Sequence, residues 1–348
     1  MTDAKAQQKA QATTAQLVAA IVGAAGHVQR RAMAKAITLV ESTRSDDRLR
    51  SEELLSALLA HGATAFRLGI SGVPGVGKST FIEALGLYLI EQGHRVAVLT
   101  IDPSSSISGG SILADKTRME RLGANERAYI RPSPSSGALG GVAGKTREAM
   151  LICEAAGYDI VIVETVGVGQ SETTVANMTD LFALLLLPNA GDELQAIKKG
   201  VMELADLVVV NKADLDETAA GRACAQLAST LSLLGRHGGQ KHDRPGSAVW
   251  RPRVLQLSAL SGQGVAAFWD TVREFQSAQE RQGEFVHRRK KQALAWMWER
   301  IEAGLRHEFV ANRRVQSLLG GLTQDVLEGR MPASTAAHKL LEMHMNRA

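Results

Sequence analysis

Gly72-Val-Pro-Gly-Val-Gly-Lys-Ser79 matches the pattern G-x-x-x-x-G-K-[ST], in which a glycine-rich loop folds around a phosphate group. The glycines let the backbone curl so that several N–H groups point at one phosphate, and the following helix adds the positive end of its dipole. An apolar run at 67–71 precedes the loop and a helical pattern at 79–92 follows it, as this mechanism requires. Lys78 would reach the β- and γ-phosphates, and the Ser79 hydroxyl would bind Mg²⁺. A glycine-rich turn without a ligand is the alternative, and the two flanks argue against it.

Beyond this loop, short apolar runs alternate with helical patterns as far as residue 279. Apolar strands separated by helices are typical of a parallel sheet that helices cover on both faces. We therefore predict an α/β fold with a doubly wound, mostly parallel sheet, in which ligands bind at the carboxyl ends of the strands. Further strands are expected at 95–101, 159–165, 181–187, 207–211 and 254–258, and further helices at 142–156, 193–205, 217–234 and 265–275.

Helical patterns without strands flank this α/β region on both sides. We expect an N-terminal helical extension at 1–60, a phosphate-loop domain at 61–282 and a C-terminal helical segment at 283–348. The last segment carries Trp296 and Trp298, and each large aromatic buries about 150–250 Å². Because the α/β core is complete before these residues, we expect the C-terminal segment to hold a dimer together.

The sequence Asn211-Lys212-Ala213-Asp214 ends a predicted strand, where a nucleotide base would lie. The Asp214 carboxylate can accept hydrogen bonds from N1–H and the 2-amino group of guanine, whereas adenine would leave it without partners. A surface turn after a strand is the alternative, because Asn, Lys and Asp are common in turns. Ser258-Ala259-Leu260 ends another predicted strand, and the Ala259 N–H would face guanine O6. These residues favour GTP over ATP.

Glu164 ends the apolar strand at 159–165 and is followed by Gly167. A carboxylate at this place can hold the shell of Mg²⁺, and the Gly167 N–H can meet the γ-phosphate. Small regulatory GTPases usually have Asp where this chain has Glu, so we expect contact with the ion through water. Val168 stands where several of them have a water-orienting Gln, so intrinsic hydrolysis should be slow.

A loop rich in Gly and Ser joins Asp102 to Asp115 and has a carboxylate at each end. This composition suits a segment that orders around phosphate and metal, although an ordinary surface loop is the alternative. Lys198 and Lys199 follow another loop, and a solvated helix face explains them as well as a role in hydrolysis does.

The composition excludes several classes of protein. Among 348 residues, 45% are hydrophobic and 22% charged, as in ordinary globular proteins. With 4 Trp, 3 Tyr and 7 Phe the chain has few aromatics to stack on single-stranded nucleic acid, and its net charge of +4 fits a phosphate ligand without requiring nucleic acid. Its 2 cysteines cannot form a disulfide framework or a four-ligand zinc site.

We expect a cytoplasmic protein that does not enter a membrane. The chain has no run near the roughly 18–20 apolar residues that a membrane helix needs. The run 17–26 has the length of a signal-peptide core, but a long polar stretch with Asp3 precedes it and a helical pattern follows it. Residues 1–30 contain one arginine, Arg30, so a mitochondrial transit peptide is not clear, although a matrix origin stays open.

The loop GVPGVGKST, the stretch TIDPSSSISGGSILADKTRM, the strand end ETVGVGQSE and the sequence NKAD together resemble one family. It is the family of methylmalonyl-CoA-mutase-associated GTPases, earlier described as arginine/ornithine-transport kinases. The resemblance covers roughly residues 30–345 and is most specific over 67–260. It implies a homodimer built on the C-terminal helices. It also implies a chaperone that uses GTP to load, protect and reactivate an adenosylcobalamin-dependent methylmalonyl-CoA mutase.

The resemblance also assigns site residues. It implies phosphate binding by Gly72, Val73, Pro74, Gly75, Val76, Gly77, Lys78, Ser79 and Thr80, and base binding by Asn211, Lys212, Asp214, Ser258, Ala259 and Leu260. It implies a Mg²⁺ shell and switch function for Ser79, Asp102, Asp115, Glu164 and Gly167, and a further mobile segment with Gln195 and Lys198. The catalytic residues expected from this set are Lys78, Asp102, Glu164 and Lys198.

Two other functions remain possible from the residues alone. A small-molecule kinase could use the same phosphate loop, but such kinases usually take ATP, against which NKAD argues. A protein-targeting GTPase would also fit the loop, but the chain lacks a methionine-rich RNA-binding tail.

Overall fold

The computed structural model describes residues 2–42, 44–101, 119–133, 139–165, 171–188, 199–237 and 250–345. The chain divides into two compact units, Met1–Lys290 and Lys291–Ala348. The first unit contains the α/β region, and the second is helical.

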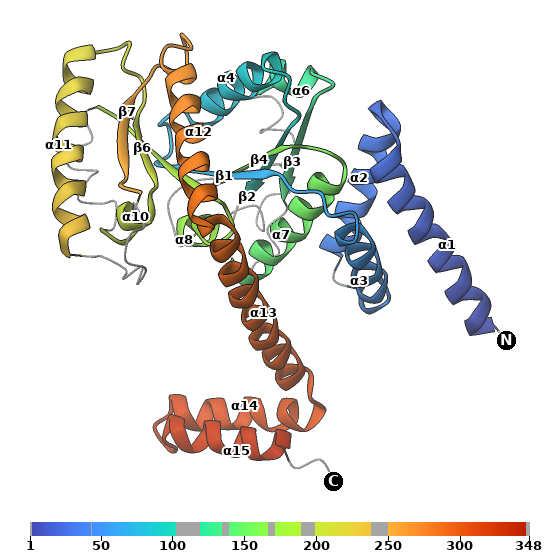
Figure 1. Ribbon diagram of the computed structural model, residues 1–348. Coiled ribbons are helices and arrows are strands. Elements are labelled where there is room, and N and C mark those ends of the chain that lie inside the picture. The colour runs from blue at the N-terminus through green and yellow to red at the C-terminus, as the bar shows by residue number, and fades with distance from the viewer. Residues whose placement is uncertain are drawn as a thin grey trace. The chain divides into compact units, whose positions relative to one another are not determined.

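The described residues of the first unit form one sheet of seven parallel strands, in the order β3-β2-β4-β1-β5-β6-β7 (Figure 1). The predicted α/β class with a parallel sheet is therefore confirmed. The strands are β1 (Phe66–Gly72), β2 (Val96–Ile101), β3 (Ala128–Ser133), β4 (Ile160–Thr165), β5 (Leu181–Leu186), β6 (Leu207–Val210) and β7 (Arg253–Gln256).

The sequence did not predict strand β3. Its residues, AYIRPS, include an arginine and a proline, so they lack the apolar run by which the other strands were predicted. Such residues are tolerated because β3 is an edge strand with a neighbour on one side only. Proline has no N–H to donate, and on the open side of an edge strand none is needed.

Helices cover both faces of the sheet and bury side chains that alternate along each strand. On β2, Val98 contributes to the core on one face and Leu99 to the core on the other. The first face is covered by α4 (Lys78–Glu91), α6 (Glu120–Ala124) and α12 (Val265–Gln282). The second is covered by α7 (Leu139–Ala155), α8 (Ser171–Ala176), α10 (Lys199–Leu204) and α11 (Glu217–His237).

The N-terminal residues form a layer of three helices, α1 (Thr2–Gly23), α2 (Gly26–Glu41) and α3 (Ser45–Leu59), which packs over α7 (Figure 1). The buried side chain of Gln29 joins this layer to the core. Its amide donates to the carbonyls of Ile21 at 2.7 Å and Ala156 at 2.9 Å, and it accepts from Arg95 at 2.7 Å. The predicted helical extension is thus a packed part of the first unit.

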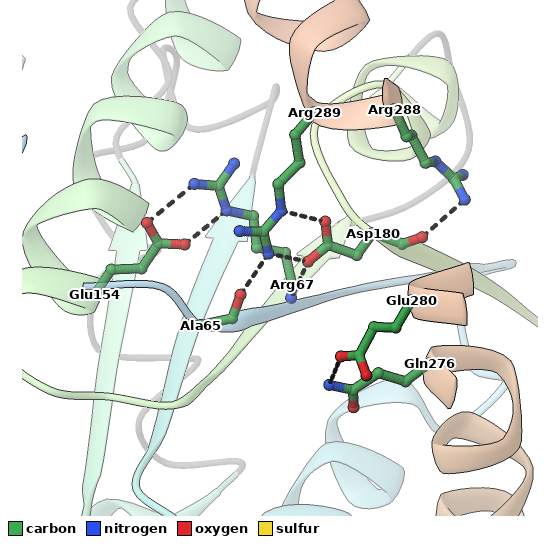
Figure 2. Close-up of polar contacts among 8 residues, drawn as sticks. All are labelled: Ala65, Arg67, Glu154, Asp180, Gln276, Glu280, Arg288 and Arg289. Carbon is green, nitrogen blue, oxygen red and sulfur yellow. Dashed lines mark hydrogen bonds and ion pairs between the residues drawn. The ribbon is translucent and has the colours of Figure 1, made fainter. Parts of the chain in front are cut away.

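Two arginines at the start of α13 (Glu284–Ala311) bind the amino ends of the central strands (Figure 2). Arg289 donates to both carboxylate oxygens of Asp180, at 2.8 and 2.5 Å, and to the carbonyl of Ala65. Asp180 also accepts from the backbone N–H of Arg67 at 2.8 Å, and its own carbonyl accepts from Arg288 at 2.7 Å. Burial works to lower the pKa of Arg289, but the hydrogen bond and charge of Asp180 raise it above its usual value. This cluster lies at the amino ends of the strands, and the phosphate loop lies at their opposite, carboxyl ends.

The second unit contains most of α13 together with α14 (Arg313–Leu327) and α15 (Ala333–Met345). Helices α14 and α15 pack against each other and bury Val315, Ala336 and Leu340. Asn312 caps α14 by accepting from the N–H groups of Arg314 and Val315. Across the part of the chain that the structure describes, we find no helix with the length and apolar character needed to span a membrane.

Candidate nucleotide-binding site

The glycine-rich loop turns between β1 and α4 and packs closely against neighbouring strands. Gly77 precedes α4 with φ +94°, a left-handed conformation that favours glycine. A Cβ on Gly77 would lie 2.7 Å from Nδ2 of Asn211, and one on Gly72 would lie 2.4 Å from the carbonyl oxygen of Leu185. Both positions therefore exclude other residues, as a loop that wraps a phosphate requires.

Lys78 begins α4 and folds back over the loop. Its side chain is 8% exposed, and its Nζ donates to the carbonyls of Gly72 at 2.8 Å and Val73 at 3.2 Å. The ammonium is thus held at the loop, in the place where a phosphate group would need a positive charge.

Ser79 and Glu164 meet although they lie in different elements. The Ser79 hydroxyl donates to Oε1 of Glu164 at 3.3 Å. Glu164 is in β4, next to β1, and is 3% exposed. A hydroxyl and a carboxylate at the carboxyl ends of parallel strands are oxygen ligands of the kind that Mg²⁺ prefers. The two described residues predicted for the metal are therefore in contact with each other.

The side-chain amide of Asn211 joins the phosphate loop to the loop at Ser258. Its Nδ2 donates to the carbonyl of Val76 at 2.8 Å, and its Oδ1 accepts from the N–H of Ala259 at 3.0 Å. Asn211 is buried, so both bonds are shielded from water. The structure thus brings three predicted stretches together through one residue.

The two loops expected to bind the base also contact each other. The N–H of Ala213 donates to the carbonyl of Leu257 at 3.1 Å, and the next loop is closed by Ser258, whose Oγ accepts from the N–H of Ser261 at 3.2 Å. Lys212 has φ +61°, so the chain turns sharply there. Asp214 is exposed and Leu260 is 82% exposed, and both side chains are therefore open to a ligand.

Five predicted residues lie outside the described residues, and the structure does not place them. They are Asp102 and Asp115, Gly167, and Gln195 with Lys198.

The sequence interpretation did not single out Thr100, which the structure places beside Glu164. Thr100 is on β2 and is paired in register with Glu164 on β4. Its hydroxyl is buried and makes no hydrogen bond to any residue that the structure describes. The apolar run VAVLTI does not indicate that its threonine lies beside Glu164, because burial and strand register cannot be predicted from the run itself.

Comparison with protein families gives a match to the family "Methylmalonyl Co-A mutase-associated GTPase MeaB" over residues 33–314. The chain belongs to this family. The match includes all the stretches of the site described above. As a mutase-associated GTPase, the chain is an enzyme that hydrolyses GTP to GDP and phosphate, which confirms the predicted activity and its guanine nucleotide.

Individual relatives agree with this family. A protein of Mycobacterium tuberculosis described as a probable GTPase is 50% identical over 315 residues, which are 90% of this chain and 91% of that protein. The mouse protein "Methylmalonic aciduria type A homolog, mitochondrial" is 47% identical over 330 residues, 92% of this chain and 77% of that protein.

A solved structure confirms the fold. The crystal structure of "LAO/AO transport system kinase" superposes with a TM-score of 0.72 at 36% identity and covers 95% of this chain and 97% of that chain. This member of the family thus has the phosphate-loop GTPase fold that its sequence predicts.

Proposed function

We propose that this GTPase is a nucleotide-controlled chaperone of an adenosylcobalamin-dependent methylmalonyl-CoA mutase, which it loads with intact cofactor, protects and reactivates. The observation that carries the proposal is the family match over 33–314, which spans the whole candidate site. The name of the mouse relative points to the same metabolism. The geometry supports a guanine-nucleotide switch, and the family name supplies the partner.

The phosphates bind in the loop Gly72–Thr80. The N–H groups of the loop and the start of α4 surround the phosphate oxygens, and the Lys78 ammonium exchanges its carbonyl partners for the β- and γ-phosphates. Because Gly72 and Gly77 have no room for a Cβ, glycine at both positions lets the loop pack closely on its neighbours in this shape.

The base binds between the loops at Asn211–Asp214 and Ser258–Leu260. The exposed Asp214 carboxylate accepts from N1–H and the 2-amino group of guanine, and the Ala259 region faces O6. Asn211 holds the two loops together through both ends of its amide, and the second N–H of its NH₂ group can still donate to the base. Lys212 packs beside the phosphate loop, where its Cε lies 3.9 Å from the position of a Cβ on Gly77.

The residues present fit a Mg²⁺ ion. Ser79 and Glu164 offer two oxygen donors in contact, and Asp102 and Asp115 are the further carboxylates predicted for the shell. The ion, when bound, neutralises the charge that develops on the β- and γ-phosphate oxygens. Ser79 would hold the ion through its hydroxyl, and Glu164 would hold its water shell.

The free protein lacks a complete apparatus for positioning the attacking water. Val168 stands in the place of a water-orienting Gln. We assign the missing catalytic group to Lys198, which the mutase would bring to the γ-phosphate. Supplying such a group is worth roughly 10³–10⁵ in rate in the best-studied GTPases.

A homodimer is part of the proposal, and the surface of α13 supports it. None of its residues is fully buried within this chain, and partly buried residues at its start, such as Phe285, Arg288 and Arg289, come before the exposed apolar residues from 294 onward. Four of its exposed apolar residues follow a spacing of four, three and four, which is the seam of a two-stranded coiled coil. They are Leu294, Trp298, Ile301 and Leu305. We assign a second copy of the chain as the partner of this seam.

Single-turnover GTP hydrolysis with and without purified methylmalonyl-CoA mutase tests the proposal. We expect a large stimulation by the mutase that is lost in Lys198→Ala, while basal hydrolysis and GDP affinity stay the same. Lys199→Ala is the matched control and should keep the stimulation. An absence of stimulation by mutase would exclude the chaperone function, and full stimulation in Lys198→Ala would mean that the mutase itself brings the catalytic group.

The same assay distinguishes a GTPase from a small-molecule kinase. The kinase alternative comes from the description of the solved relative as a transport system kinase. A kinase would transfer the γ-phosphate to arginine or ornithine, whereas a GTPase releases it to water. We expect all of the label from γ-labelled GTP to appear as inorganic phosphate.

A further inference from the structure

The Thr100 hydroxyl lies in a buried environment that does not favour a polar group. Thr100 is 1% exposed, and its Oγ1 has no hydrogen-bond partner among the described residues. A buried hydroxyl without a partner destabilises the fold, because its bonds to water are lost and not replaced. Valine has nearly the same shape without this cost, and β2 already contains Val96 and Val98. Packing therefore does not explain a threonine at this position.

The neighbour of Thr100 gives the reason. In the parallel pair of β2 and β4, Thr100 is opposite Glu164, two residues after the pair Val98 and Ile162. Val98 and Ile162 both belong to the core on the α4 face, and side chains two residues apart share a face. The Thr100 hydroxyl and the Glu164 carboxylate therefore lie side by side on the face that carries Ser79.

The Glu164 carboxylate can take a further donor beside Ser79. In the structure, Glu164 accepts from the Ser79 hydroxyl at 3.3 Å. A carboxylate offers about four lone-pair sites on its two oxygens, so this bond leaves room for a second hydroxyl, and the Ser79 hydroxyl can keep donating while its own lone pair faces Mg²⁺. A threonine hydroxyl on the adjacent strand can supply the second donor by rotating about χ1. Such outer partners orient the groups that hold a metal ion.

We propose that Thr100 is a positioning residue for the Mg²⁺ site, whose hydroxyl donates to the Glu164 carboxylate in the Mg²⁺–nucleotide state. This inference rests on the proposed nucleotide and metal site and adds to it a residue that itself touches neither the ion nor the nucleotide. Its role is to fix the carboxylate from the side opposite to Ser79, so that the water shell of the ion is held in one orientation.

The test measures how GDP retention depends on Mg²⁺. The dissociation rate of a fluorescent GDP is recorded across a Mg²⁺ titration, and again in EDTA, for the full-length protein. We expect Thr100→Val to raise the Mg²⁺ concentration at half-effect by about tenfold or more, with an unchanged rate in EDTA. Thr100→Ser keeps the hydroxyl and should stay close to the wild-type curve.

Two further measurements separate positioning from packing. The nucleotide-free Thr100→Val protein should unfold at the same urea concentration as the wild type or a higher one, because the hydroxyl that it removes has no hydrogen-bond partner among the described residues. Thr271→Val, which removes a buried hydroxyl of α12 that bonds to the carbonyl of Ala267, is the matched control and should leave the Mg²⁺ curve unchanged. If Thr100→Val fails to fold, Thr100→Ala removes the same hydroxyl without adding volume and decides the question.

The outcomes distinguish this inference from the proposed function. A wild-type Mg²⁺ curve in Thr100→Val or Thr100→Ala would overturn the role of Thr100 and leave the nucleotide site as proposed. Failure of the wild-type protein to bind GDP, or to respond to Mg²⁺, would instead overturn the site on which the inference rests.

Discussion

Asn211 is the residue on which most of the site depends, since its amide both donates to Val76 and accepts from Ala259. Asn211→Asp keeps an acceptor for the Ala259 N–H but turns the donor toward Val76 into a second acceptor. We expect a loss of about 1–3 kcal/mol in the free energy of unfolding, measured by urea titration. GDP affinity should fall at least about tenfold by calorimetry. Unchanged values for both would mean that the two loops are held together by other contacts.

Asp214 decides which base is accepted. Asp214→Asn replaces an acceptor by an amide, so guanine loses its partner and xanthine, which has a carbonyl at position 2, gains one. Calorimetry should show weaker GDP binding and stronger binding of xanthosine diphosphate. Asp216→Asn is the control, because Asp216 accepts from the N–H of Ala219 at the start of α11 and should not affect base preference. If Asp214→Asn binds GDP as tightly as the wild type, the guanine base does not contact Asp214.

The two cysteines should differ in reactivity. Burial raises the pKa of Cys153, and the charge of Glu154 raises it further; burial also raises the pKa of Cys224, which is only partly buried. A raised pKa means less thiolate at neutral pH, so labelling of the native protein is slow at pH 7 and faster at pH 9. A thiol-reactive dye should label Cys224 first and Cys153 only after unfolding in urea. Two fast thiols at pH 7 would contradict this.

At the same scale, the sequence predicted the residues whose type is tied to a chemical task. Lys78, Ser79 and Glu164 were predicted, and the structure puts Ser79 and Glu164 in contact. Thr100 was not predicted, because its importance depends on being opposite Glu164 in a sheet whose register the sequence does not reveal. The two side-chain contacts of Asn211, to Val76 and Ala259, were not predicted either, because they join residues 135 and 48 positions apart in the sequence.

At the scale of elements, the start of α13 is held by ion pairs at the amino ends of β1 and β5 (Figure 2). Arg289→Met leaves the buried Asp180 carboxylate without its charged partner, and breaking a buried pair in this way costs about 3–5 kcal/mol. Urea unfolding should show a loss of this order. Arg273→Met breaks an exposed pair with Asp270 and is the control, in which little change is expected. Equal effects of the two substitutions would mean that the cluster does not hold the helix.

Most of the elements could be predicted, because buried parallel strands are apolar throughout and helices have a different period. Among the strands the exception is β3, which has a neighbour on one side only, β2, so Arg131 and Pro132 are tolerated within it. The short helices α6 and α8 were not predicted. The contacts of Arg288 and Arg289 could not be predicted either. Their partners Asp180 and Asp206 precede β5 and β6, more than 80 residues earlier in the chain.

For the whole molecule, the seam on α13 predicts a dimer that depends on apolar contacts. Trp298 is 56% exposed in the single chain, so Trp298→Glu would place a charge in the middle of the seam. Light scattering should find the wild type as a dimer and this variant as a monomer with unchanged GDP affinity. Leu327→Glu, at an exposed position of α14, is the control and should remain a dimer. If the Trp298→Glu protein is still a dimer, the dimer interface lies on another surface.

The central position of β1 has a consequence for how the protein is made. Its two neighbours, β4 and β5, both come later in the chain, and the bonded hydroxyls of Ser71 and Thr165 lie 94 residues apart. A ribosome that adds about 5–20 residues per second needs on the order of 5–20 s to span that distance. During synthesis the chain therefore carries its middle strand without either of its neighbours until β4 emerges, so the apolar residues of β1 stay open to wrong contacts over that interval.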